Sequence, residues 1–404
     1  MLSTLIYRSR LSPGVTLPRL YQLADKARVN NASLEVTGIL LFDGDYFLQV
    51  LEGPLSAVNT LYEHICEDPR HYHIVQLMRD YASARRFGNL GMELMDLRDH
   101  AQETVMQTVL QHGTSKYQLS YDDRVLKFIE TFVTGGGRDN RPESDDARHW
   151  HLVSEACYQT QDDTPSEAAP CQFAFQPIVE PLKRTISSLE ALIRSPSGGP
   201  AQDYFASLPP EKLYEADLQS KYWALKQAKK MGIGRNKISL NLLPMSLVVV
   251  PDAVDILLDQ IARNGLIPDQ VIVEVTEDEV ISRFDEFERA MRQLRCSGIS
   301  LAIDDFGAGF AGLSLLSRFQ PDKLKIDRSL ITDIHHDGPK QAIVQAIITC
   351  CSAMEIAIVA EGVEKIEEWR WLEAAGIQRF QGYLFARPQL GGIAPVAWPY
   401  RREP

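Results

Sequence analysis

From about residue 170 onwards, short apolar strands alternate with helical segments of roughly 10–15 residues. This alternation predicts parallel strands that are joined by crossover helices. The pattern continues for about 235 residues, which is close to the length of a (β/α)₈ barrel. We therefore expect an α/β multidomain chain whose C-terminal part is a (β/α)₈-type barrel.

Six of the predicted strands carry polar residues with one common parity. They are SSLEALIR (187–194), KISLNLL (237–243), VIVEVTE (271–277), SLAIDDFG (300–307), KLKID (323–327) and IAIVAEG (356–362). Side chains alternate along a strand, so one face meets the helices and the other faces the barrel axis. The polar residues stand on this second face, near the carboxyl ends of the strands, where the active sites of such barrels are assembled. A single polar residue at such a position would be read as a solvated loop residue. Six polar residues at the same axial level of the barrel instead predict an active site.

The ligand types in this set indicate its chemistry. The possible metal ligands among these residues are all oxygen donors: Glu190, Asn241, Glu274, Asp304, Asp305 and Glu361. Such donors suit Mg²⁺ or Mn²⁺ rather than Zn²⁺ or copper. Lys325 and Arg194 on the same face favour an anionic substrate, and a phosphodiester fits best. Two divalent ions would activate a water and stabilise both oxygens of an in-line displacement. The residues alone thus predict a metal-dependent phosphoesterase.

Residues 1–95 predict a small ferredoxin-like α+β domain with helices on one face of a sheet. The strand STLIYRS precedes a helix from Leu17 to about Asn30. A hairpin then turns at Asp43-Gly44-Asp45, and a helix near Val58–Cys66 and a strand near Ile74–Met78 follow. Two helical segments lie in residues 100–133, and the polar stretch after them reads as a connector. The predicted domains are therefore 1–95, 96–149 (connecting helices and loop) and 150–404.

Two polar residues of the N-terminal strands face an apolar layer. Gln49 shares strand parity with Phe47 and Leu51, so its amide requires hydrogen-bond partners. Partners from the backbone and partners from a ligand both satisfy that requirement. Tyr7 shares parity with Leu5 and reads by default as a core tyrosine.

Charge and composition exclude several classes of protein. The net charge of −12 argues against a nucleic-acid binder. The six cysteines are scattered, with no C-x-x-C pair, which fits reduced thiols in the cytoplasm. Neither a secretory leader nor an apolar run long enough to span a membrane is present, so we expect a soluble cytoplasmic protein.

A series of motifs over roughly residues 150–404 resembles the EAL family of cyclic di-GMP phosphodiesterases. The motifs are EAL with Arg194 (190–194), Asn241-Leu242, EVTE (274–277), DDFGAGF (304–310), LKID (324–327), AEGVE (360–364) and QGYLFARP (381–388). The resemblance implies hydrolysis of cyclic di-GMP to linear pGpG. The six oxygen donors above would then ligate two Mg²⁺ or Mn²⁺ ions.

The same resemblance implies roles for further residues. Lys325 would orient the attacking water, with Glu361 or a metal-bound hydroxide as the base. Glu277 would hold the DDFGAGF loop, which helps to organise the second metal. Gln176, Arg194 and Gln381 would contact the substrate. The loop has Ala308 and Phe310 where Thr and Tyr are more common. None of the metal acids is missing, so we expect activity.

The first 95 residues resemble the BLUF family of flavin-based blue-light sensors. The matching positions are Tyr7, Asn31, Gln49 and Met92, with His64, Asp68, Arg70 and His71 where other members contact the cofactor. The resemblance implies non-covalent FAD, with FMN as an alternative. Tyr7 and Gln49 would form a hydrogen-bond chain to the flavin ring, and light would drive electron and proton transfer from the tyrosine. Leu90 stands where many members have Trp, which leaves the output path open.

The main alternative is a light-gated receptor that binds cyclic di-GMP without turnover. A redox flavoenzyme lacks support because no nicotinamide fingerprint is present, and no GGDEF-like synthase motif indicates synthesis. EAL domains commonly pair, so we expect a homodimer, with cyclic di-GMP as its ligand and no nucleic-acid partner.

Overall fold

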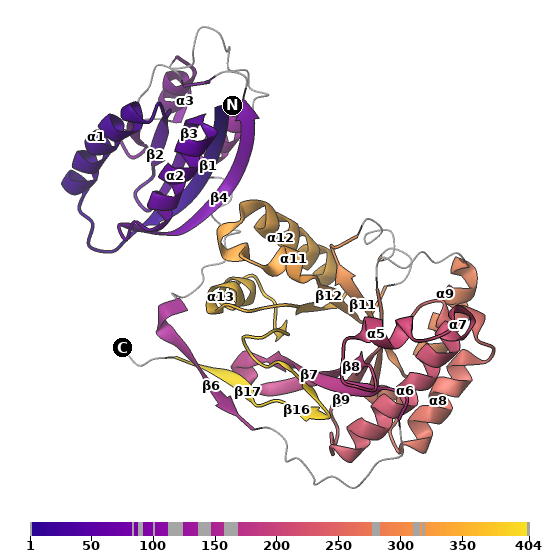
Figure 1. Cartoon of the computed structure of the whole chain (residues 1–404). Coiled ribbons are helices and arrows are strands. Elements are labelled where there is room, and N and C mark those ends of the chain that lie inside the picture. Colours follow the sequence, from indigo (N-terminus) through magenta and orange to yellow (C-terminus); the bar gives the residue numbers. More distant parts are fainter. Residues whose placement is uncertain are drawn as a thin grey trace. The chain divides into compact units, whose positions relative to one another are not determined.

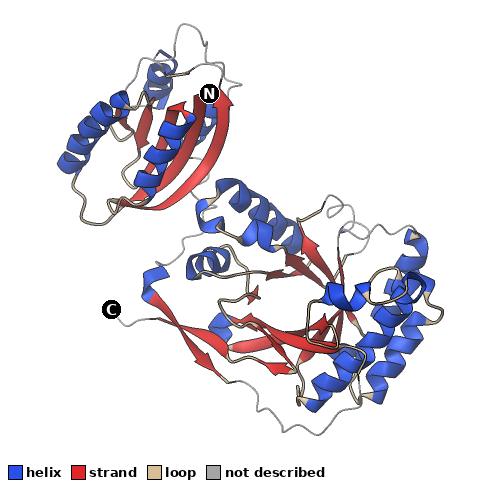
Figure 2. Ribbon diagram, in the orientation of Figure 1, coloured by secondary structure: helices blue, strands red, loops and turns tan. Residues whose placement is uncertain are grey.

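The computed structural model describes residues 2–82, 85–87, 92–99, 102–111, 124–135, 147–156, 169–276, 283–309, 316 and 320–401. The chain forms two compact units (Figures 1 and 2). The first comprises residues 1–142 with 333–343, and the second comprises 143–332 with 344–404. The domain boundaries expected near residues 95 and 149 stay a prediction.

The first unit is built on a five-stranded sheet with strand order β4-β1-β3-β2-β5. Its elements are β1 (Leu2–Leu11), α1 (Leu17–Ser33), β2 (Thr37–Phe42), β3 (Tyr46–Pro54), α2 (Leu55–Cys66), β4 (His71–Ala82), β5 (Glu93–Asp96), α3 (Gln102–Gln111) and α4 (Arg124–Val133). The strands β1, β3, β2 and β4 pair antiparallel, and β5 adds to β2 in parallel. This is the predicted ferredoxin-like α+β domain, extended by one strand.

The β2–β3 hairpin turns where the sequence predicted it. Asp43 Oδ1 accepts hydrogen bonds from the backbone N–H groups of Asp45 (3.0 Å) and Tyr46 (2.7 Å). Gly44 has a φ of 109°, a conformation that side chains with a Cβ rarely adopt. The short acidic side chain and the glycine together close the turn.

Helices cover both faces of this sheet. Residues of α2 pack with Leu5, Tyr7 and Leu51 on one face. On the other face, the apolar residues of α3 and α4 pack against Leu48 and Val50 of β3. Within residues 1–95 the helices lie on one face, as predicted, and the helices of 100–133 supply the second layer. Successive residues of β3 therefore face different layers, with Leu48 and Val50 toward α3 and α4.

The second unit contains a closed eight-stranded barrel (Figure 1). Its strands are β7 (Gln172–Glu180), β8 (Thr185–Arg194), β9 (Lys237–Asn241), β10 (Val271–Thr276), β11 (Ser300–Phe306), β12 (Lys323–Ile326), β13 (Ala357–Ala360) and β14 (Arg379–Phe380). The strands from β8 to β14 are parallel, and β14 pairs with β7 to close the ring. The predicted barrel is confirmed.

One strand corrects the expectation of an all-parallel barrel. β7 runs antiparallel to both β8 and β14. The physical reason lies in the connection: β7 and β8 are joined by residues 181–184 only, which is too short for a crossover helix and forces a hairpin.

Further elements complete the chain, and the helix α12 (Gly338–Ala353) spans the boundary between the two units at residue 343. They are α5 (Ala201–Ala206), α6 (Leu213–Lys230), α7 (Ser246–Val249), α8 (Ala253–Arg263), α9 (Phe284–Cys296), α11 (Arg328–Ile331), α12 (Gly338–Ala353), α13 (Ile366–Ala374), and the strands β6 (Trp150–Glu155), β15 (Pro388–Leu390), β16 (Gly392–Ile393) and β17 (Val396–Arg401). Among the described helices, none combines the length and the apolar character that crossing a bilayer requires.

Candidate functional site

Four carboxylates of the barrel converge on one ammonium group. Lys325 Nζ lies 2.7 Å from Glu361 Oε1, 2.8 Å from Glu274 Oε2, 3.0 Å from Asp304 Oδ1 and 3.4 Å from Glu190 Oε2. These residues stand on β8, β10, β11 and β12 and directly after β13. The shared parity therefore does bring them to the barrel axis. Lys325 and Glu274 are each 1% exposed.

Amide side chains continue this network. Asn241 Nδ2 donates to Glu190 Oε1 (2.7 Å), and Gln381 Nε2 donates to Glu190 Oε2 (2.6 Å). Gln381 Nε2 also donates to Gln176 Oε1 (3.1 Å), and Gln176 Nε2 donates to the Ala386 carbonyl (3.1 Å). The Oε1 atom of Gln381 is buried and has no hydrogen-bond partner among the described residues. An acceptor is thus available at this end of the network.

The backbone of β11 lets two adjacent acids reach the same place. Consecutive strand residues normally point to opposite faces. Asp305, however, has a φ of 54°, and the pairing of β11 with β12 shifts register between Ile303 and Phe306. Such irregularities re-aim side chains beside active sites. As a result, oxygens of Asp304, Asp305 and Glu361 all lie within 4.8 Å of one another.

The crowding of carboxylates changes their proton affinity. Burial raises the pKa of Glu274 to about 7; the ammonium of Lys325 opposes this shift, and the charges of Glu190 and Asp304 add to it. Burial and the neighbouring Asp304 raise the pKa of Asp305 to about 6. These groups would release their protons more readily beside additional positive charge.

The residues present fit divalent ions. Glu190, Glu274 and Asp304 form one group of close oxygens, and Asp304, Asp305 and Glu361 form a second that shares Asp304. Five carboxylates around one ammonium carry a formal charge of −4 when ionised. Hard oxygen donors with surplus negative charge are the ligands that Mg²⁺ and Mn²⁺ prefer.

One further predicted residue stands apart from this network, and two positions named in the sequence analysis cannot be placed. Arg194 ends β8, and its guanidinium donates to the Ile193 carbonyl (2.8 Å). Glu277 and Phe310 lie outside the described residues. Their predicted roles therefore stay predictions.

A cavity of about 540 Å³ lies in the first unit, between residues of α1 and α2. All eight residues predicted to bind the cofactor line it: Tyr7, Asn31, Gln49, His64, Asp68, Arg70, His71 and Met92. Apolar side chains such as Leu11, Leu23 and Phe47 complete the lining. A mostly apolar cavity of this size with a few convergent polar groups suits a planar cofactor.

The polar end of the cavity holds a chain of hydrogen bonds. The Tyr7 hydroxyl donates to Gln49 Oε1. Gln49 Nε2 and Asn31 Nδ2 both donate to Met92 Sδ, at 2.8 Å and 3.5 Å. Burial raises the pKa of Tyr7, so the tyrosine stays protonated and remains a donor. The amide of Gln49 therefore has side-chain partners in Tyr7 and Met92, and its predicted contact with a ligand stays a prediction.

Charged residues line the mouth of the cavity. Arg70 Nε donates to both Asp68 oxygens, at 2.6 and 2.8 Å, and His71 Nδ1 lies 2.8 Å from Ser9 Oγ. Burial lowers the pKa of His71, so its ring is neutral near pH 7. The amides and the guanidinium among the lining residues would suit the polar ring edge and the phosphate of a flavin.

Sequence reasoning missed two supporting contacts. Asp217 pairs with Lys221 inside α6, and its Oδ2 accepts hydrogen bonds from Leu243 N (3.0 Å) and Ser246 Oγ (2.8 Å), which fixes the loop after Asn241. An acid and a lysine four residues apart on a helix look like a surface pair in sequence. Similarly, no local pattern predicts that Arg28 Nε donates to the Met92 carbonyl (3.1 Å).

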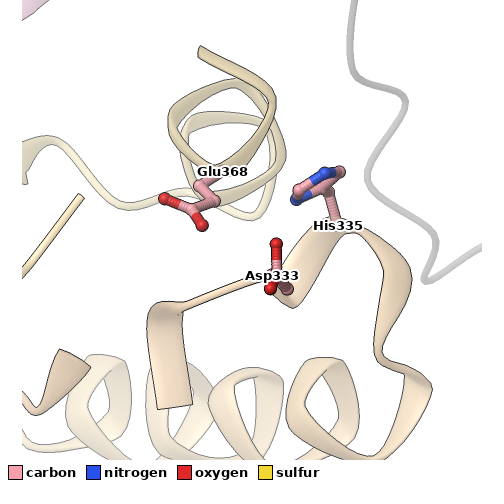
Figure 3. Close-up of side chains that lie close together, drawn as sticks. All are labelled: Asp333, His335 and Glu368. Atoms are coloured by element: carbon pink, nitrogen blue, oxygen red, sulfur yellow. The ribbon is translucent and has the colours of Figure 1, made fainter. Parts of the chain in front are cut away.

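Another group of side chains lies away from the barrel axis. Ligand atoms of Asp333, His335 and Glu368 lie within 4.8 Å of one another (Figure 3). Glu368 accepts hydrogen bonds from the backbone N–H groups of Glu364 and Lys365 at the start of α13. Its burial therefore has a structural explanation, since a carboxylate satisfies the free N–H groups of a helix start.

Comparison with known families decides the assignment. The sequence profile described as "EAL domain" matches residues 166–388, more than half of the chain. The BLUF profile, "Sensors of blue-light using FAD", matches residues 2–93. The chain belongs to the family of BLUF–EAL proteins. The resemblance inferred from the motifs is confirmed for both parts.

Two relatives match this chain along their whole length, and a third matches its EAL part. The chain is 49% identical over 403 residues to the Escherichia coli "Blue light- and temperature-regulated antirepressor BluF", with all of both chains covered. It is 46% identical to Klebsiella pneumoniae BlrP1 in a manganese/cy-diGMP complex, at a TM-score of 0.91 with full coverage of both. Another BlrP1 structure contains FMN and cyclic diGMP (42% identity, TM-score 0.87, both chains fully covered). The EAL part is 33% identical over 224 residues to the Pseudomonas aeruginosa "Cyclic di-GMP phosphodiesterase NbdA", covering 53% of this chain and 28% of NbdA.

Proposed function

We propose that this BLUF–EAL protein hydrolyses cyclic di-GMP to linear pGpG under control of blue light. The observation that carries the proposal is the convergence of four carboxylates on Lys325, with Asp305 close to two of them. Two relatives of the chain are a named cyclic di-GMP phosphodiesterase and a protein crystallised with manganese and cyclic di-GMP.

Each group of the site has a task in this reaction. Two Mg²⁺ or Mn²⁺ ions, when bound by the six oxygen donors, would supply the Lewis acidity that activates water and stabilises the leaving oxygen. Lys325 donates a hydrogen bond that orients the attacking water. Glu361, whose Oε1 atom lies 2.7 Å from Lys325 Nζ, accepts a proton from that water. Gln381 and Gln176 bind the substrate from the amide end of the network.

Light control begins in the first unit. A flavin, FAD by the family description and FMN in one relative, would supply absorption of blue light. Tyr7, Gln49 and Asn31 would hydrogen-bond to the polar edge of the flavin. Gln49 faces the cavity, whereas its neighbours Leu48 and Val50 pack against α3 and α4. A change in the hydrogen bonds of Gln49 thus shifts these helices, and through them the activity of the barrel. We also expect the protein to act as a homodimer.

A second candidate is control of a partner protein without turnover. The 49% identical relative is named an antirepressor, which is a protein-binding function. In that case the barrel would bind cyclic di-GMP, and light would change the affinity for a partner.

The two candidates are separated by one assay on purified protein. Cyclic di-GMP and pGpG are quantified by chromatography over time, with Mg²⁺ or Mn²⁺, in darkness and under blue light. Glu190→Gln serves as the inactive variant. Accumulation of pGpG by the wild type alone supports hydrolysis, whereas binding of cyclic di-GMP without pGpG supports the second candidate.

A further inference from the structure

The barrel interior beneath the carboxylate site is also polar. Inward-facing residues of a strand recur every second position, so those just before the site residues form lower layers about 6.6 Å apart. The polar residues at these positions are Ser188, Lys237, Ser239, Lys323 and Arg379, which we call the lower cluster; Ile272, Ala302 and Val359 stand at the matching positions of β10, β11 and β13. The strand register supports this grouping, because Ser188 of β8 pairs with Lys237 of β9. Barrel layers are usually filled by branched apolar residues, so three cations here require an explanation.

The cations of the lower cluster act electrostatically on one another. The pKa of Lys323 falls to about 8, first because of burial and then because of the positive charge of Arg379; the carboxylate of Glu274 opposes this shift and Lys237 adds to it. Arg379 Nε is 3.1 Å from Glu180 Oε1, but the same carboxylate also pairs with Lys183 (2.6 Å). Among the described residues, no carboxylate lies within ion-pair distance of Lys237 or Lys323. Arg379 thus shares a carboxylate with Lys183, whereas the Nζ atom of Lys237 lies 3.5 Å from the hydroxyl of Ser300.

Two hydroxyls of the lower cluster also lack partners. Ser188 and Ser239 are 0% exposed, and in the part of the chain that the structure describes neither Oγ atom has a hydrogen-bond partner. A buried hydroxyl without a partner carries an uncompensated desolvation cost. Their shared parity with the site residues of β8 and β9 directs both into the barrel. The hydroxyls therefore lie on the same face of the sheet as Lys237, which pairs with Ser188.

We propose that the lower cluster binds a small oxyanion of the phosphate class at the end of the barrel opposite the carboxylate site. A tetrahedral dianion matches the cluster because it accepts several hydrogen bonds and carries two charges. The guanidinium of Arg379 and the ammonium groups of Lys237 and Lys323 bind the charge. Ser188 and Ser239 donate their hydroxyls to its oxygens. The side chain of Arg379 is 29% exposed, so an anion in solution reaches it from this end. This site does not depend on hydrolysis of cyclic di-GMP.

Calorimetric titration of the metal-free full chain with inorganic phosphate tests the proposal. Sodium chloride at matched ionic strength controls for general charge screening. We expect saturable phosphate binding whose Kd rises roughly ten- to a hundredfold in Lys323→Met, since one charge-assisted contact is lost. The matched control is Lys230→Met, an exposed lysine at the end of α6, which should bind phosphate as the wild type does.

A footprint on the wild-type chain gives a second readout that does not depend on the folding of a variant. Acylation of individual lysines is followed by mass spectrometry with and without phosphate. Phosphate should slow the labelling of Lys237 and Lys323 several-fold and leave Lys230 unchanged. Phosphate that binds no better than chloride, or that binds without protecting these two lysines, would overturn the proposal.

Discussion

The Nζ atom of Lys325 lies 2.8 Å from Oε2 of Glu274 in a part of the barrel where both residues are 1% exposed. Removing two charges from water is costly and is repaid only when the pair is well bonded. Although burial lowers the pKa of Lys325, the surrounding carboxylates outweigh it and raise that pKa well above the ordinary value. The ammonium is therefore permanently charged and holds the carboxylates together when no metal is bound.

Lys325→Met should abolish hydrolysis and destabilise the metal-free chain. Removing one partner of a buried ion pair costs about 3–5 kcal/mol because the remaining charges lose their compensation. Urea denaturation in the presence of a chelator measures the free energy of unfolding, and pGpG formation measures activity. Lys230→Met should change neither quantity. A Lys325→Met protein as stable as the wild type would show that the carboxylates are not held by this ammonium.

The stability of the metal-free chain should depend on pH through Glu274. Its pKa is raised to about 7 in the folded chain, mainly by burial. A carboxyl group whose pKa is higher in the folded chain than in the unfolded chain stabilises the folded chain when it is protonated. This contribution is complete below the pKa of the unfolded chain, near 4, and is lost as the pH rises through 7. Thermal unfolding between pH 4 and pH 8 should therefore show a steeper decline in the wild type than in Glu274→Gln. Glu211→Gln, at an exposed position, should retain the wild-type slope.

Much of this site could be predicted because it depends on strand parity. Period-two alternation is local, so Glu190, Glu274 and Lys325 were assigned to the barrel axis without any tertiary information. The approach of Asp305 to the same place depends on a positive φ and a register shift, which no sequence pattern signals. The reversed direction of β7 follows from the short connection 181–184, and none of the six strands predicted from the sequence lies at residues 172–180 to reveal it.

Manganese should stabilise the wild-type chain and act far less on Glu190→Gln. A ligand at 100 times its Kd raises the free energy of unfolding by about 2.7 kcal/mol. Loss of one carboxylate ligand should weaken metal binding by at least about tenfold. Thermal unfolding at increasing Mn²⁺ concentration gives both apparent affinities. Equal stabilisation of the two proteins would place the ion elsewhere.

Gln49→Leu and Tyr7→Phe should retain flavin but lose the response to light. Each change breaks the hydrogen bond between the Tyr7 hydroxyl and Gln49 Oε1, while the apolar lining of the cavity stays. Absorption spectra before and after blue light report the response, and the flavin-to-protein ratio reports binding. Tyr72→Phe on β4, which does not line the cavity, is the control. A normal light-induced spectral change in Gln49→Leu would exclude the proposed route.

The flavin cavity was predictable in part for a different reason. The parity of Gln49 showed that an amide enters an apolar layer, and family motifs supplied the other positions. Met92 was identified by motif, but its role as the acceptor for both Gln49 and Asn31 depends on how residues 92–99 approach α1. Contacts between segments distant in sequence leave no periodic signal, which is why Arg28 was missed.

The most direct test is the rate of cyclic di-GMP hydrolysis by the purified flavin-loaded protein with Mg²⁺ or Mn²⁺, in darkness and under blue light. The account predicts pGpG formation that requires metal, changes with light and disappears in Glu190→Gln. Absence of pGpG in both conditions, from a protein that retains flavin and binds cyclic di-GMP, would contradict it.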